Sequence, residues 1–415
     1  MDRLWRRRTI PSTGSFDKLR TASGHRLEGR DMHPLRKAAA IVGVAESDLG
    51  RTPDKTPLQL IAQATKRALD SAGLTLADVD GVTTTNLPGL PALQVAEYLG
   101  VQPSFIDSTT LGGSSIEVQL EHTVAAMAAG LCHVVILTFG STLVSSGGRQ
   151  HGGYSTHPTF PVDQFDRLYG PLLPISAYAM AARRHKHQYG TTSEQLAEIA
   201  VATRKWASMN PVATMRGPIT IDDVLNSRMI SSPLHLLDCC LVCDGGGAVV
   251  VASAERAKSL RKPPVWVLGF GSYHTHVDIC SMPDLTSVPA KVSGEKAFRM
   301  AGITHKDIDV AEIYDSFTIT VLLTLEDLGF CPKGEGGAFV EGQRTAPGGS
   351  FPMNTQGGAL SYLHAGPFGI FLLIEAARQL WGECGPRQIQ GARTALCNAT
   401  GGELASVSTI ILGRD

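Results

Sequence analysis

The stretch "AGITHKDID", residues 301–309, repeats the stretch "AGLTLADVD" of residues 72–80. Five positions are identical and Ile303 stands opposite Leu74, without a gap, at one constant offset of 229 residues. Each copy follows an amphipathic helical pattern and precedes a short apolar strand. Solenoid repeats have periods of about 20 to 50 residues. A repeat at this much longer offset therefore indicates that a whole α/β domain is duplicated.

The segments around the repeat alternate between strand and helix patterns. "HTVAAMAAGLCHVVILTFGS", residues 122–141, predicts a small-residue helix, a stop at Gly130 and an apolar strand of a sheet that is buried on both faces. The mostly helical stretch from about 141 to 232 predicts an inserted cap. We expect an N-terminal half over 35–265 that includes this cap, a C-terminal half over 266–415, and a disordered extension over 1–34. A start at Met32 is the alternative to that extension.

The composition is that of an ordinary enzyme. The 415 residues are 43% hydrophobic and 18% charged, with a formal net charge of −1. There is no sustained basic run beyond the first few residues, so nucleic acid is not an expected partner. No apolar run reaches the roughly 20 residues that span a bilayer, so no membrane span is expected.

The cysteines indicate a reducing compartment. Eight cysteines in a chain of this length, with no secretory leader, predict reduced thiols in the cytoplasm. Cys239, Cys240 and Cys243 lie close together, but no second Cys/His pair stands at zinc spacing. The histidine pairs 151/157 and 274/276 have no matching carboxylate or thiol set. No metal site is predicted.

The stretch "NTQGGALSYLHAGPFG", residues 354–369, holds the most concentrated chemistry. It feeds the N-terminus of the predicted helix "GIFLLIEAARQL", residues 369–380. Exposed N–H groups near Gly357 and Gly358, together with His364 and the helix dipole, can stabilise a carbonyl oxygen that becomes negative. The stretch, which begins at Asn354, is equally compatible with a glycine-rich turn that carries an ordinary histidine.

Two further strand-to-helix junctions carry reactive side chains. Tyr314 and Asp315 follow a short predicted strand, and Tyr314 is an acid, a base or a packed aromatic, of which packing is the commonest. Ser114 and Ser115 follow Gly112 and Gly113, and a helix N-cap is a commoner role there than a nucleophile. In a duplicated α/β domain such junctions are expected to converge where the halves meet.

These motifs resemble the thiolase superfamily, and specifically its sterol-carrier-type (lipid-transfer-protein) branch. The pattern Asn-x-x-Gly-Gly-Ala-x4-His is similar to the thiolase segment whose histidine lies in the oxyanion hole. Further similar stretches are "SAYAMAARRHKHQYGTTSEQLAEIAV", "PLHLLDCCLVCDGGGAVVVAS" and "LEDLGFCPKGEGGAFVEG". The resemblance covers about residues 38–414. It implies a duplicated thiolase fold of five αβαβα layers with an inserted helical cap.

The chain departs from thiolases at the nucleophile. Ser114 stands where the family's reactive cysteine is expected, and a serine hydroxyl is a poor acyl acceptor without a base. Cys397 lies near the second thiolase cysteine, one residue out of register. The chain resembles the nucleophile-lacking thiolase-like aldolases of steroid side-chain breakdown, which cleave a β-hydroxyacyl-CoA. That resemblance implies proton transfer by Tyr314 and Tyr362, and His364 as the group that holds the enolate oxygen.

The resemblance also implies partners, and it leaves rival functions open. It implies a homodimer with a separate OB-fold and zinc-ribbon subunit, an acyl-CoA substrate and no permanently bound cofactor. The first rival is an acyltransferase, such as an acetyl-CoA acetyltransferase, which predicts acyl transfer to CoA and a labelled cysteine. The second is a lipid or acyl-CoA carrier, which predicts binding without turnover.

Overall fold

Two half-sheets form the centre of this computed structural model, which describes residues 33–147, 159–171 and 174–415. Within those residues, nine strands follow the order β3-β2-β4-β7-β1-β8-β11-β10-β9. They are β1 (Ala39–Glu46), β2 (Gly81–Thr83), β3 (Phe105–Asp107), β4 (Val134–Ser141), β7 (Gly245–Ser253), β8 (Val265–His274), β9 (Val310–Ile313), β10 (Thr394–Gly401) and β11 (Ser406–Gly413). β5 (Met229–Ser231) and β6 (Leu234–His235) pair separately.

The two half-sheets have the same topology. In the first, β2 and β4 are parallel, and β4, β7 and β1 follow in antiparallel pairs. In the second, β9 and β10 are parallel, and β10, β11 and β8 follow in antiparallel pairs. β3 flanks β2 in parallel, and a parallel bridge from Met353 flanks β9 at Ala311. The duplication predicted from the sequence repeat is therefore confirmed.

The repeated residues have the same conformations and hydrogen bonds in both halves. Gly73 and Gly302 end the helices before the repeated strands, at φ of 70° and 69°, which only glycine adopts readily. Asp80 accepts hydrogen bonds from the backbone N–H groups at the start of β4. Asp309 accepts the equivalent bonds at the start of β10. The repeat is thus the fixed corner between a helix and two strands of each half.

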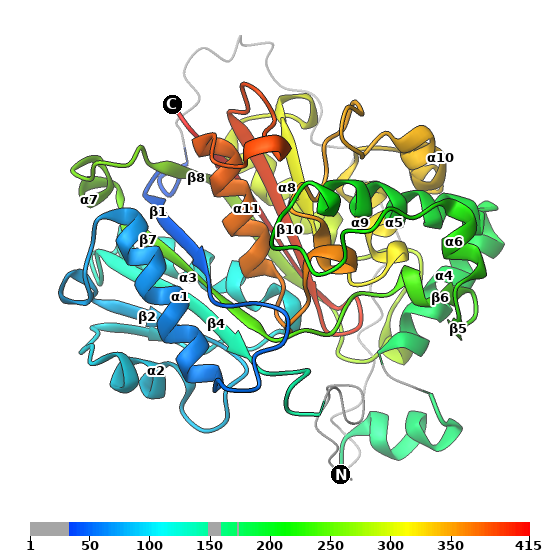
Figure 1. The fold of residues 1–415 in the computed structure, drawn as a ribbon, viewed down its shortest axis with the longest axis horizontal. Helices are drawn as coiled ribbons and strands as arrows, with labels where there is room; N and C mark the ends of the chain where they lie inside the picture. Colours follow the sequence, from blue (N-terminus) through cyan, green and yellow to red (C-terminus); the bar gives the residue numbers. More distant parts are fainter. Residues whose placement is uncertain (1–32, 148–158, 172–173) are drawn as a thin grey trace, which may run out of the picture. The chain divides into compact units, whose positions relative to one another are not determined.

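Helices complete five layers, as expected for a duplicated thiolase fold (Figure 1). α1 covers β1, β4 and β7, and α8 covers β8 and β11. α3 and α11 contact each other and strands of both halves, so they form the middle layer. The helices are α1 (Pro57–Ala72), α2 (Pro91–Leu99), α3 (Ser115–Ala128), α4 (Ile175–Tyr189), α5 (Ser193–Ser208), α6 (Ile221–Asn226), α7 (Ala254–Lys258), α8 (Ala290–Ala301), α9 (Thr318–Leu328), α10 (Gly336–Val340) and α11 (Gly369–Trp381).

The strands are buried on both faces. Ala40 and Val42 of β1 pack into one apolar core, whereas Ala39 and Ile41 pack into a second core. The second core includes side chains of both α3 and α11, so it is the inner core between the half-sheets.

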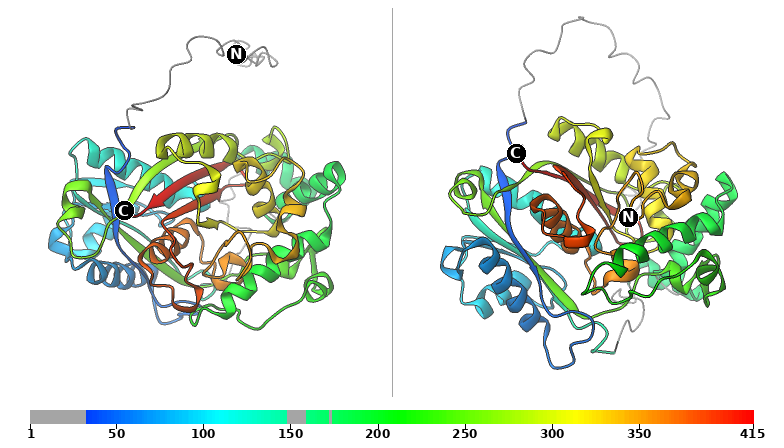
Figure 2. Two further views of the ribbon diagram at one scale, coloured as in Figure 1. Left: turned by 90° about the horizontal axis from the view of Figure 1, so that it is seen from above. Right: turned by 45° about the horizontal axis from the view of Figure 1, so that its top comes forward.

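The helices of the predicted cap region pack on loops of the second half (Figure 2). α4 and α5 contact α9, and α5 also contacts α10 and the π-turn η11 (Gly358–Tyr362). The buried imidazole of His185 on α4 joins the cap to α9 through a 3.0 Å contact between its Nε2 and Glu326 Oε2. The cap thus belongs to the first half in sequence and lies over the loop of residues 354–369. The predicted domain boundaries themselves stay a prediction, and the extension predicted for 1–34 lies almost wholly outside the described residues.

Candidate active site

Three glycine-bearing junctions meet at the start of α3 and α11. A Cβ built on Gly113 would lie 2.2 Å from the Tyr314 ring and 2.3 Å from the carbonyl oxygen of Thr400. A Cβ built on Gly369, where α11 begins, would lie 2.9 Å from the Gly113 carbonyl oxygen. Because Gly113 and Gly369 carry no side chain, these backbone segments can approach each other and Tyr314 closely. The convergence expected from the sequence is confirmed.

Tyr314 and His364 form a hydrogen-bonded pair at this meeting point. The Tyr314 hydroxyl lies 2.6 Å from His364 Nε2, and both side chains are buried. The two rings are stacked with centroids 5.8 Å apart, and Phe368 stacks on the Tyr314 ring at 5.3 Å. Tyr314 is therefore more than a packed aromatic, because its phenol forms a hydrogen bond with an imidazole.

Asp315 holds the loop that carries His364. Its carboxylate accepts hydrogen bonds from the N–H groups of Ala359, at 2.6 Å, and Leu360, at 3.2 Å. A Cβ on Gly358, which has a φ of 57°, would lie 2.0 Å from Asp315 Oδ2, so this position requires glycine. Burial raises the pKa of Asp315 to about 7. The structure places Asp315 and Gly358 as positioning residues for η11.

The rest of the predicted loop is also held by hydrogen bonds within the protein. Asn354, at a φ of 53°, accepts the N–H of Ile313 on its Oδ1 at 2.7 Å. The N–H groups of Gly357 and Gly358, predicted as oxyanion donors, donate inside the loop to Asn354 O and Gln356 Oε1. His364 is thus the predicted oxyanion ligand that the loop presents beside Tyr314.

Ser114 lies at the start of α3, where the nucleophile was expected, but its hydroxyl is engaged elsewhere. Its Oγ is 2.8 Å from Ser406 Oγ, which in turn is 2.8 Å from His274 Nδ1. The N-cap role predicted for Ser114 is wrong, because its side chain makes no capping bond to α3. The side chain of Ser115 instead accepts the N–H of Leu111.

Tyr362 lies in the same inner core as Tyr314, but its hydroxyl has a different partner. The phenol donates to Glu46 Oε1 at 2.9 Å, and both Glu46 oxygens are held by the guanidinium of Arg378. Burial and the neighbouring Glu46 carboxylate raise the pKa of Tyr362 well above its usual value. Burial opposes the ionisation of Glu46, but Arg378 lowers its pKa overall. The structure does not bring the Tyr362 hydroxyl into the hydrogen bond between Tyr314 and His364.

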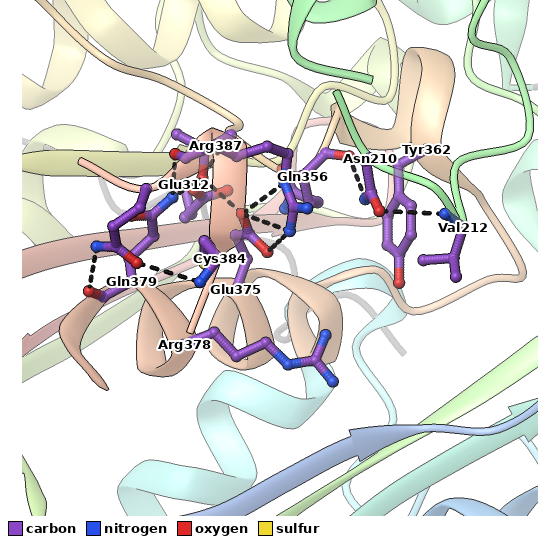
Figure 3. Close-up of polar contacts among 12 residues, drawn as sticks. Asn210, Val212, Glu312, Gln356, Tyr362, Glu375, Arg378, Gln379, Cys384 and Arg387 are labelled. Atoms are coloured by element: carbon purple, nitrogen blue, oxygen red, sulfur yellow. Dashed lines mark hydrogen bonds and ion pairs between the residues drawn. The ribbon is translucent and has the colours of Figure 1, made fainter. Parts of the chain in front are cut away.

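A buried polar network supports the loop from behind (Figure 3). The hydroxyl of Thr355 lies 3.0 Å from Glu312 Oε1 and 2.8 Å from Glu375 Oε1, and Glu375 forms an ion pair with Arg387. Burial and the nearby Glu375 raise the pKa of Glu312 well above its usual value. The network fixes Thr355 beside Asn354.

The cysteine near the second thiolase position does not provide a reactive thiolate. Cys397 lies fully inside β10, and burial raises the pKa of its thiol well above the usual value. In the part of the chain that the structure describes, no group of three or more His, Cys, Asp or Glu side chains is placed to hold a metal ion. His151 and His157 lie outside those residues. Among the described helices, none combines the length and the apolar character needed to cross a bilayer.

Sequence reasoning missed the partners of Tyr362 and Ser114. Glu46 is a weak signal, since it is a charge placed directly after the apolar run of β1. Arg378 reads as an ordinary helix cation, and Ser406 as a strand residue. His274 stood out in the sequence only as half of a histidine pair that lacks further metal ligands, and the structure places it on Ser406.

Comparison with known proteins finds relatives along most of the chain. Residues 271–414 match the family model described as thiolase C-terminal domain-like. The chain is 35% identical to the 17-hydroxy-3-oxo-4-pregnene-20-carboxyl-CoA lyase of Mycobacterium tuberculosis, over 91% of this chain and 100% of the relative. It is 32% identical to an acetyl-CoA acetyltransferase of Methanothermobacter thermautotrophicus, over 90% and 99%. The solved structure named Ltp2-ChsH2(DUF35) aldolase superposes with a TM-score of 0.82 at 32% identity, over 92% of this chain and 99% of that chain.

Proposed function

Because this chain belongs to the thiolase superfamily, in the sterol-carrier-type branch that includes steroid side-chain-cleaving aldolases, we propose that it cleaves a β-hydroxyacyl-CoA by a retro-aldol reaction. One observation carries the proposal: the buried pair of Tyr314 and His364 stands beside a junction that has Ser114 in place of a thiol. Retro-aldol cleavage needs proton transfer and a stabilised enolate, and it needs no covalent intermediate.

The proposed chemistry uses the residues of this pocket in turn. The β-hydroxyl loses its proton, the bond between the α and β carbons breaks, and its electron pair passes to the thioester enolate. His364 donates to the enolate oxygen, and the phenols of Tyr314 and Tyr362 exchange protons with the substrate. Asn354, Gly357, Gly358 and Asp315 hold the loop in place.

We further propose the assembly in which the reaction takes place. Coenzyme A enters as part of the substrate, and no resident cofactor is needed by the steps above. From the family resemblance we infer a homodimer joined to a separate OB-fold and zinc-ribbon subunit. The similar aldolase structure, whose name joins two components, supports a second subunit. The cytoplasm is the proposed compartment, in keeping with the reduced thiols predicted from the sequence.

The test is turnover of a β-hydroxyacyl-CoA with a branched or steroid-like acyl chain, with a partner subunit supplied. Mass spectrometry should show the shortened acyl-CoA and the released ketone or aldehyde without added free CoA. Tyr314→Phe should lower kcat by about 100-fold or more, the usual range for a lost acid or base. Full activity of this variant would contradict the assignment, and binding without any turnover would favour a carrier.

The second candidate is an acyltransferase, and one observation favours it. Ser114 Oγ reaches the imidazole of His274 through Ser406, so a serine nucleophile would have a base two hydrogen bonds away. A similar acetyl-CoA acetyltransferase exists at 32% identity. This reading requires an acyl mass on the Ser114 peptide and cleavage that depends on added CoA.

A further inference from the structure

Glu403 is a buried carboxyl with one uncommitted oxygen. Its side chain is 1% exposed, and its Oε2 accepts the backbone N–H of Ile279 at 2.7 Å. Within the described residues, Oε1 has no hydrogen-bond partner. Leaving such an acceptor buried and unpaired is unfavourable. A donor that arrives with a ligand would remove this cost.

The carboxyl lies next to the glycine junction of the candidate active site. It follows Gly401 and Gly402, in the turn between β10 and β11. A Cβ on Gly401 would lie 2.9 Å from Ser114 Oγ, and a Cβ on Gly112 would lie 2.9 Å from the nitrogen of Gly402. The turn is therefore in contact with the same junction that closes on Tyr314.

The cap covers this turn from the other side. Tyr178 of α4 donates its hydroxyl to the carbonyl of Gly402 at 3.2 Å, and its ring lies 4.3 Å from that of Phe317. Phe317 follows Tyr314 and Asp315 in the same strand-to-helix connection. Glu403 is thus enclosed between the cap and the catalytic junction, whereas the buried Glu117 lies behind the junction in the middle helical layer.

We propose that Glu403 is the base of the proposed reaction, and that its Oε1 accepts the β-hydroxyl of the substrate and takes the proton as the carbon–carbon bond breaks. This inference rests on the proposed function, which assigns two phenols but no group that is ionised near neutral pH. The O–H electron pair becomes the new carbonyl bond, and the electron pair of the broken bond forms the enolate. A phenol then protonates the enolate carbon, and the proton on Glu403 returns through solvent to the phenolate, which restores both groups.

The same contact would select the substrate. A β-hydroxyacyl-CoA brings an O–H donor to Oε1, whereas a β-ketoacyl-CoA brings only a second acceptor. Sites that hydrogen-bond a substrate hydroxyl strongly reject analogues without this hydroxyl, because a polar group of the site is then left unpaired. Glu403 would therefore separate an aldolase from a thiolase by substrate as well as by nucleophile.

The electrostatic surroundings suit a base that works near neutral pH. Burial raises the pKa of Glu403 to about 7, and Asp278 and Asp166 act in the same direction, opposed by Arg167. The ionisable groups around it are Tyr178, Asp166 and Arg167 from the cap region, and His276, Asp278 and Cys280 from the loop before α8, where His276 Nε2 lies 3.0 Å from the Glu403 carbonyl oxygen. The rate should therefore rise with pH through about 7, as the carboxyl loses its proton.

The experiment compares Glu403→Gln with Glu121→Gln in cleavage of a secondary β-hydroxyacyl-CoA. Glu121 is a matched control, because burial also raises its pKa to about 7 while Ser408 and Ser272 occupy both of its oxygens. Glu403→Gln should lose about 100-fold or more in kcat and should lose the pH limb near 7. Glu121→Gln should keep both. A Glu403→Gln enzyme with wild-type kcat and an unchanged pH limb would overturn the inference.

A comparison of binding affinities tests the role of Glu403 independently of the proposed function. In the Tyr314→Phe background, β-hydroxyacyl-CoA should bind at least about 10-fold more tightly than the β-ketoacyl-CoA of the same chain, and the added Glu403→Gln should abolish this preference. If wild type forms no product, the proposed function fails and this preference still decides the role of Glu403. If Glu403→Gln does not fold, Glu403→Asp and the wild-type preference decide it. Equal binding of the two thioesters would overturn it.

Discussion

The ion pair between Glu46 and Arg378 is the interaction whose loss the structure predicts most sharply. Arg378 holds both oxygens of Glu46, and Tyr362 donates a third hydrogen bond to the same carboxylate at 2.9 Å. Removing one partner of a fully buried pair costs about 3–5 kcal/mol. The side chains here keep 25% and 13% exposure, so water relieves part of that penalty. Glu46→Gln should therefore lower the free energy of unfolding by about 2–3 kcal/mol.

A double-mutant cycle tests whether Tyr362 is part of this unit. Tyr362→Phe removes a hydrogen bond to a charged acceptor, which is worth about 1.5 kcal/mol or more. In the Glu46→Gln background the same change should cost about 0.5 kcal/mol, because the acceptor is then neutral. A coupling near 1 kcal/mol follows, well above the roughly 0.3–0.5 kcal/mol error of additivity. The coupling is measured from the midpoints of urea unfolding, at one protein concentration and for variants with equal m-values.

The sign of the pH dependence provides a second test of the same pair. Arg378 outweighs burial and lowers the pKa of Glu46 in the folded state, so its stabilisation is complete above the unfolded pKa of about 4.3. It is lost as the pH falls through the folded pKa. The difference between wild type and Glu46→Gln should therefore shrink in acid. Strict additivity in the cycle, or a difference that grows in acid, would refute the reasoning. Asp70→Asn is the control, because its exposed pair with Lys66 is worth about 0.3–0.5 kcal/mol.

Two further changes test the geometry of the pocket. Gly113→Ala would place a Cβ 2.2 Å from the Tyr314 ring, so kcat should fall by at least about 10-fold, whereas Gly217→Ala, with no atom within 4 Å, should be silent. Equal kcat in the two variants would contradict the close approach. Asp315→Asn tests the buried carboxyl. Because its folded pKa is raised to about 7, wild-type stability should fall as the pH rises from about 4 to 7, and this share of the slope should vanish in the variant. Urea midpoints across that range measure it, and an unchanged slope would contradict it.

The fold was predictable because its decisive features are local and repeated. The glycine that ends each repeated helix and the aspartate that caps each following strand pair lie within nine residues of chain, and they recur at an offset of 229. The junction glycines were predictable for the same reason, since Gly112, Gly113 and Gly369 mark places where two backbones come together. The meeting of Tyr314 and His364 followed from the duplication and from the resemblance to thiolases.

The hydrogen-bond partners of the site were not predictable, because they join distant parts of the chain. Ser114 and Ser406 are 292 residues apart, and Glu46 and Arg378 are 332 apart. No periodicity or spacing relates such positions in a single sequence. Tyr362 illustrates the consequence. It stands two residues before His364, yet its hydroxyl reaches a carboxylate on β1 because the π-turn η11 ends at Tyr362 and turns its ring toward α11.

Glu403 shows where a sequence signal existed and was missed. It is the one charged residue in "LCNATGGELASVSTIILG", residues 396–413, and a charge in an otherwise uncharged, buried segment has to meet a donor, a cation or a ligand. The structure supplies one donor, Ile279, and leaves one oxygen without a partner among the described residues. The thiolase resemblance drew attention to Cys397 in the same segment instead. Because Ser114 replaces the nucleophile, the proposed reaction still needs a base. The segment that holds Cys397, near the second thiolase cysteine, also holds the Glu403 carboxyl.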